Sequence, residues 1–129
     1  MKKQEQGYIA LLAVLIIGAA ATAIALALLT TGIDSQRGGL VALQSKQARS
    51  LAVACTEEAL QQIHDSASFT GTNPITLGMG SCSYTVTNTG ASTRTITTTA
   101  TVGSVVRKTQ VYVTIGASSL SITSWQEVN

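Results

Sequence analysis

The sequence predicts an α+β fold in which one long N-terminal helix, over about residues 8–65, packs on a small antiparallel sheet of three or four strands. Three observations predict it. Residues 8–33 form an uncharged apolar run, residues 40–65 repeat with a helical period, and residues 82–125 alternate with a period of two. Because only short breaks separate the strand-like runs, we expect neighbouring strands to pair as a meander.

A short basic leader, MKKQEQG, occupies residues 1–7. Lys2 and Lys3 outnumber Glu5, whereas the charges that directly follow the apolar run cancel. The positive-inside rule therefore places the N-terminus in the cytoplasm and the remainder of the chain outside. A secretory signal cleaved within Ala19–Ala23 is a weaker alternative, because the chain stays apolar after that point and would keep a sticky end.

The apolar run from Tyr8 to Ile33 reads YIALLAVLIIGAAATAIALALLTTGI. At a helical rise of about 1.5 Å per residue it spans roughly 39 Å, more than the ~30 Å hydrocarbon core of a bilayer. The run therefore predicts a membrane span. Its many alanines and Gly18 suit close packing against another helix, but alanine is also simply a good helix former, and composition does not decide between the two.

Three glycines, Gly32, Gly38 and Gly39, follow the apolar run. Each costs about 1 kcal/mol in a helix interior relative to alanine. Since no proline occurs here, we expect a helix that continues but bends or weakens over residues 30–39.

An amphipathic half of the helix follows at residues 34–66, and a small β head at residues 67–129. The apolar stripe of this half-helix predicts a face that packs on the sheet. Its members are Leu40, Leu43, Ala48, Leu51, Cys55, Ala59 and Ile63.

Residues 66–81, rich in glycine and holding Asn73-Pro74, read as a loop. Strands are expected from Cys82 onward, with Cys82, Tyr84 and Val86 on one face. The further strands are predicted over residues 93–102, 105–115 and 120–125, with Gly103-Ser104 as a two-residue hairpin loop.

The two cysteines, Cys55 and Cys82, both follow the apolar run and so share a compartment. Outside the cytoplasm disulfides persist, and closing this loop would stabilise the small head by roughly 3–4 kcal/mol. A disulfide is therefore predicted, with two unrelated buried thiols as the alternative.

Chemistry-bearing residues are sparse. The net charge of +2, with 11% charged residues, argues against nucleic-acid binding. The single histidine, His64, has no metal-ligand set around it, and Glu57-Glu58 point about 100° apart on a helix. Arg107 and Lys108 lie on opposite faces of one strand and form no patch. We expect no cofactor and no enzyme activity.

The leader KKQEQG followed at once by YIALLAVLII, the amphipathic continuation and the small β head together resemble the type IV pilin family. The resemblance implies that a prepilin peptidase cleaves between Gly7 and Tyr8 and that Tyr8 is methylated. It also implies a helix held in the membrane before assembly and then buried among other pilin subunits in a filament that ATP-driven assembly machinery builds.

One position departs from the family pattern: Leu12 stands where the fifth mature residue is usually glutamate. The resemblance therefore points to minor pilins or pseudopilins of the filament tip, where no subunit precedes them. QSKQARSLAVACTEEAL and GSCSYTVTNTG also look like minor-pilin-type proteins. The expected location is a single-pass membrane protein that later joins a cell-surface filament.

An alternative is a bitopic membrane-anchored module that displays its β head for adhesion or sensing and does not polymerise. It differs from the pilin-like reading in keeping residues 1–7.

Overall fold

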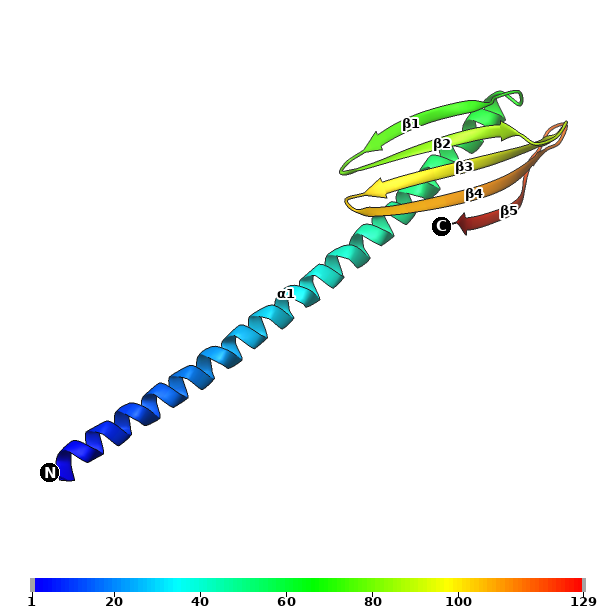
Figure 1. The fold of residues 1–129 in the computed structure, drawn as a ribbon. Helices are drawn as coiled ribbons and strands as arrows, with labels where there is room; N and C mark the ends of the chain where they lie inside the picture. The colour runs from blue at the N-terminus through cyan, green and yellow to red at the C-terminus, as the bar shows by residue number, and fades with distance from the viewer. Residues whose placement is uncertain (1, 129) are drawn as a thin grey trace. The chain divides into compact units, whose positions relative to one another are not determined.

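The computed structural model describes residues 2–128, with side chains from residue 6 onward. It consists of one helix and one sheet. In chain order the elements are α1 (Lys2–Asp65), β1 (Gly71–Leu77), β2 (Gly80–Asn88), β3 (Thr93–Val102), β4 (Val105–Ile115) and β5 (Leu120–Val128). The strands pair antiparallel in the order β1-β2-β3-β4-β5 (Figure 1), which confirms the predicted α+β class and meander.

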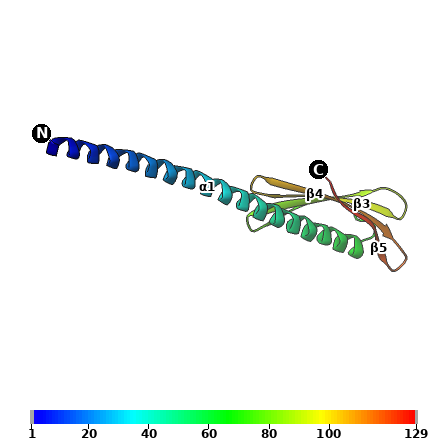
Figure 2. The ribbon, with the colours of Figure 1, turned by 90° about the horizontal axis from the view of Figure 1, so that it is seen from below.

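The chain forms two compact units, Met1–Leu40 and Val41–Asn129. We call them the N-terminal unit and the C-terminal unit. Helix α1 belongs to both, and its last part packs on one face of the sheet within the C-terminal unit (Figure 2). The predicted helix began at residue 8, whereas α1 already includes the leader from Lys2.

The sheet has one strand more than predicted. Residues 71–77, expected to be a loop, form β1 and pair with β2 from Gly71 opposite Val86 to Leu77 opposite Gly80. The segment was predicted as a loop because it contains Pro74 and is flanked by glycines, which are typical of turns. Because β1 is an edge strand, proline can occupy it without leaving the partner strand short of a hydrogen bond.

Two hairpin loops have the same design. Gly78 and Gly103 each have a φ of 59°, a conformation that L side chains rarely adopt, and each is the first of two loop residues. The loop predicted at Gly103-Ser104 is thus confirmed, with glycine first as the turn requires.

The core lies between α1 and the sheet. Cys82, Tyr84 and Val86 are buried on one face of β2, as predicted. The helix contributes five buried apolar residues, Ala48, Ala52, Cys55, Ala59 and Ile63. The prediction was wrong for Leu40 and Leu43, which are 55% and 53% exposed, because the β3–β4 turn at the end of the sheet lies level with Gln44.

At Gly80 the sheet lies close to the helix and leaves no room for a side chain. A Cβ there would lie 2.8 Å from Leu51 Cδ2 and 2.8 Å from Val102 Cγ2. Both neighbours are held by packing, so a methyl group must displace them. Replacing Gly80 by alanine is expected to cost about 1–3 kcal/mol of the free energy of unfolding, measured by urea denaturation. The exposed neighbour Ser81→Ala is the control, and an equal effect of the two changes would contradict the tight contact.

Candidate functional site

The predicted processing junction lies within the first turns of α1. Gly7 and Tyr8 are both exposed, and nothing lies within 4 Å of a Cβ built at Gly7. The peptide bond between them is therefore accessible from solvent. Because glycine weakens a helix interior, Gly7 lowers the local stability of the helix beside this bond.

The run from Tyr8 to Ile33 is exposed on every side. Each residue from 6 to 43 is exposed, so the apolar side chains cover the full circumference of the helix and not one stripe. This helix is long and apolar enough to cross a membrane. A helix that is hydrophobic all round needs an apolar environment on all sides.

Apart from Tyr8 at its first position, the polar side chains in this run are three threonines, and the threonine hydroxyl groups are satisfied within the helix. Thr22 Oγ1 donates to the carbonyl oxygen of Ala19 at 2.9 Å. Thr30 and Thr31 donate to the carbonyl oxygen of Ala27 at 2.9 and 2.7 Å. In lipid, where no water can pair with a hydroxyl, such internal hydrogen bonds remove the penalty for burying it.

Leu12 lies within this run and is 41% exposed. The run therefore carries no charge at the position where the resembled family has a carboxylate. The three glycines predicted to bend the helix, Gly32, Gly38 and Gly39, are helical, and a Cβ at each would meet nothing within 4 Å. The bend itself stays a prediction.

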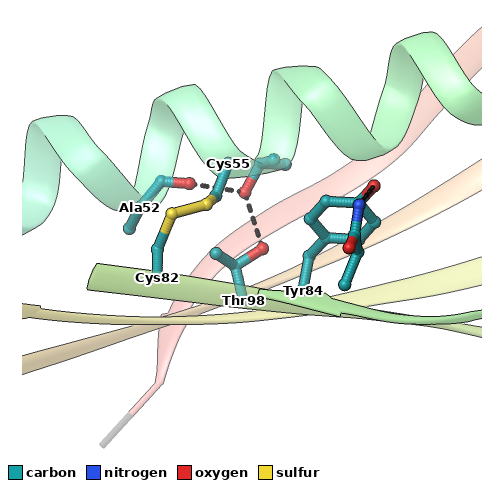
Figure 3. Close-up of a disulfide and its surroundings, with 7 residues drawn as sticks. Ala52, Cys55, Cys82, Tyr84 and Thr98 are labelled. Atoms are coloured by element: carbon teal, nitrogen blue, oxygen red, sulfur yellow. Dashed lines mark hydrogen bonds between the residues drawn. A yellow bond between two sulfur atoms is a disulfide. The ribbon is translucent and has the colours of Figure 1, made fainter. Parts of the chain in front are cut away.

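Cys55 and Cys82 form the predicted disulfide, which joins α1 to β2 (Figure 3). Their Cα atoms are 6.4 Å apart, and the two residues are 1% and 4% exposed. Disulfides are typical of proteins outside the cytoplasm. This bond is covered on one side by the helix and on the other by the sheet, so it is a structural link.

Beside the disulfide, one buried hydrogen bond also crosses from helix to sheet (Figure 3). Thr56 Oγ1 donates to the carbonyl oxygen of Ala52 at 2.8 Å and lies 3.0 Å from Thr98 Oγ1. Since both hydroxyls are buried, each satisfies the other. Sequence analysis missed Thr56 and Thr98, although the alternation of β3 already placed Thr98 on the face of Ile96.

Arg94 is a second feature that sequence analysis missed. It is only 7% exposed, and its guanidinium donates to the carbonyl oxygen of Ala67 at 2.9 Å and to Asn88 Oδ1 at 3.0 Å. It therefore ties the segment after α1 to the β2–β3 turn. The signal was present in the sequence, because the alternation of β3 puts Arg94 on the same face as Ile96.

The polar side chains at the end of α1 do not converge on one site. His64 Nδ1 is 3.5 Å from Asp65 Oδ1 with both side chains exposed, and Ser66 Oγ lies against Ser68 Oγ at 3.3 Å. Across the described residues no group of three His, Cys, Asp or Glu side chains is placed to hold a metal ion.

No protein-family model, curated protein or solved structure matches this chain. Three features of the molecule bear on function: the apolar helix, the Gly7–Tyr8 junction and the disulfide-linked C-terminal unit.

Proposed function

We propose that the chain is a pilin-like structural subunit, of the minor or tip type, of a type IV pilus or a related secretion pseudopilus, and that it is not an enzyme. Its partners are other pilin subunits through the N-terminal helix, the prepilin peptidase and the assembly machinery. Membrane lipid surrounds the helix before assembly.

The exposed apolar circumference of residues 8–33 carries this proposal. So large an apolar surface is not left in water and must be covered by lipid or by other chains. A bilayer and the core of a helical filament both cover a helix on all sides, and the three internally bonded threonines suit both environments. Gly7 supports processing, since it stands where the basic leader meets the apolar run.

Leu12 supports the tip-type assignment. A carboxylate inside an apolar core is costly unless a neighbouring charge pairs with it. Because Leu12 removes that charge, the helix needs no preceding subunit to supply a pairing charge. This suits a tip subunit, which has no subunit before it.

Co-expression with a prepilin peptidase is expected to remove residues 1–7 and to expose Tyr8, methylated, as the new N-terminus. The physical reason is that a small residue before the cleaved bond leaves the peptidase unobstructed access. Intact-mass spectrometry measures the loss directly. The control Gly7→Val, with a branched side chain at the junction, should keep its leader.

An unaltered chain that retains residues 1–7 beside the peptidase would disprove the processing step. The assembly step has a separate readout: the processed chain should be found in filaments sheared from cells. Filaments that form normally without this chain, and that never contain it, would remove the assembly role even if processing stands.

The alternative function is a bitopic module that stays anchored and does not polymerise. The uncharged helix also suits this alternative, because no charge in residues 8–33 requires a pairing partner and the three threonine hydroxyl groups are bonded within the helix. An uncleaved leader, together with retention in membranes after shearing, would establish this alternative.

A further inference from the structure

The fold brings four basic side chains to one end of the C-terminal unit. Arg107 Nη2 donates to Ser45 Oγ at 2.6 Å, which sets the start of β4 beside the first turns of the packed helix. Lys46 and Arg49 lie on those turns, and Lys108 follows Arg107 on β4, on the opposite face of the same end of the sheet. We call Lys46, Arg49, Arg107 and Lys108 the basic collar.

The basic collar carries excess positive charge. Glu127 Oε1 lies 3.3 Å from Arg107 Nη1, and Glu127 Oε2 lies 3.8 Å from Arg49 Nε, so one carboxylate serves two guanidinium groups. Lys46 and Lys108 are exposed and have no ion pair among the side chains of residues 6–128. The remaining carboxylates of the unit lie further along α1, at Glu57, Glu58 and Asp65.

Exposed apolar side chains accompany the basic collar. Val106, beside Arg107, is 49% exposed, and Leu43 is 53% exposed. Met79, in the β1–β2 loop near Gly80, is 96% exposed. Basic residues mixed with exposed apolar residues are typical of surfaces that lie at a lipid headgroup layer.

The length of chain between the apolar run and the basic collar fits a membrane surface. Lys46 follows Ile33 by 13 residues, about 20 Å along a helix. The headgroup layer takes up roughly 5–8 Å of this, and the long lysine side chain leans toward the helix N-terminus. The chain can therefore hold Lys46 within reach of anionic headgroups, whose attraction extends over the ~8 Å Debye length at physiological salt.

We propose that the basic collar binds the anionic lipid headgroups of the membrane that holds residues 8–33, and so docks the C-terminal unit on the bilayer surface. Each basic residue near an anionic surface adds to the attraction. The proposal rests only on residues 8–33 spanning a bilayer, which pilin-like subunit and anchored module have in common. It therefore stands or falls separately from leader processing.

The test uses the full chain at one copy per lipid nanodisc, with nitroxide-labelled headgroups as the quencher. The reporter is Ser104→Trp, in the exposed β3–β4 loop, in a Trp125→Phe background. Its fluorescence should be quenched more strongly in phosphatidylcholine discs that contain phosphatidylglycerol than in phosphatidylcholine alone. At about 1 M salt, where the Debye length is ~3 Å, this difference should disappear.

The variant Lys46→Gln/Arg49→Gln/Lys108→Gln should lose the dependence on phosphatidylglycerol, whereas the matched control Glu57→Gln/Glu58→Gln should keep it. Arg107 is left unchanged because it bonds to Ser45. Equal quenching in the two lipids for the chain with intact collar, or a dependence that survives in the triple variant, would overturn the proposal. Quenching that requires two chains per disc would instead assign the collar to a second copy. The salt series needs no collar substitution, so a folding defect in the triple variant does not weaken the test.

Discussion

Replacing Tyr84 by alanine is expected to lower the free energy of unfolding of the C-terminal unit by about 3–5 kcal/mol. Tyr84 is fully buried and is the largest side chain in the core cluster. It belongs to the same buried cluster as the helix residues Ala59 and Ile63, so its removal leaves a cavity between the two layers. Small alanines on the helix bring the layers close and leave little freedom to collapse into that cavity. Urea denaturation followed by Trp125 fluorescence, on the full chain in detergent, measures the loss.

The conservative variant Tyr84→Phe separates packing from hydrogen bonding. Tyr84 Oη accepts a hydrogen bond from Asn73 Nδ2 at 3.2 Å, and phenylalanine removes only that bond. Its expected cost is about 1 kcal/mol. If alanine and phenylalanine cost the same, the ring contributes little to the core, and the packing argument fails.

The packed faces of the helix and the sheet could be predicted because the side-chain periods of helices and strands follow from backbone geometry. Alternation put Cys82, Tyr84 and Val86 on one face of a strand, and all three are buried. The helical period likewise placed Ala59 and Ile63 on the packed face. These patterns are local, and each needs only a partner surface to be satisfied.

Apart from the disulfide, two features that depend on distant pairing were not predicted. Whether Pro74 is tolerated in a strand depends on that strand being at the sheet edge, which is decided by all five strands together. The basic collar depends on the hydrogen bond between Arg107 and Ser45, which are 62 residues apart in the sequence. From sequence, Arg107 and Lys108 alternate across one strand and form no patch, and only the packing of β4 on α1 brings Arg107 beside the helix turns that carry Lys46 and Arg49.

The candidate site divides in the same way. Gly7, Tyr8 and Leu12 were identified by a resemblance at the leader, and their roles remain predictions. The hydrogen bonds of the threonines at 22, 30 and 31 could not be assigned from the sequence alone. Their hydroxyl groups bond to carbonyl oxygens of the same helix, which removes the cost of burying these hydroxyls in lipid.

Removing the disulfide by the double change Cys55→Ala/Cys82→Ala is expected to cost about 2–5 kcal/mol of the free energy of unfolding. The bond joins two residues 27 apart in the sequence, and the closed loop between them contains the end of α1 and the whole of β1. Without the bond, the unfolded chain gains the freedom that the closed loop denied it. Pulse proteolysis in a urea series should show the transition at lower urea and faster cleavage under native conditions.

A reductant provides the matched control, because it opens the bond without changing the core volume. Denaturing the unaltered chain in dithiothreitol should move its transition toward that of the double variant, while the variant itself should not respond. Equal protease resistance of the oxidised unaltered chain and the variant would contradict a stabilising bond. The expected loss is large relative to the 5–15 kcal/mol that holds most domains together, so a chain oxidised only outside the cytoplasm would complete its C-terminal unit only after crossing the membrane.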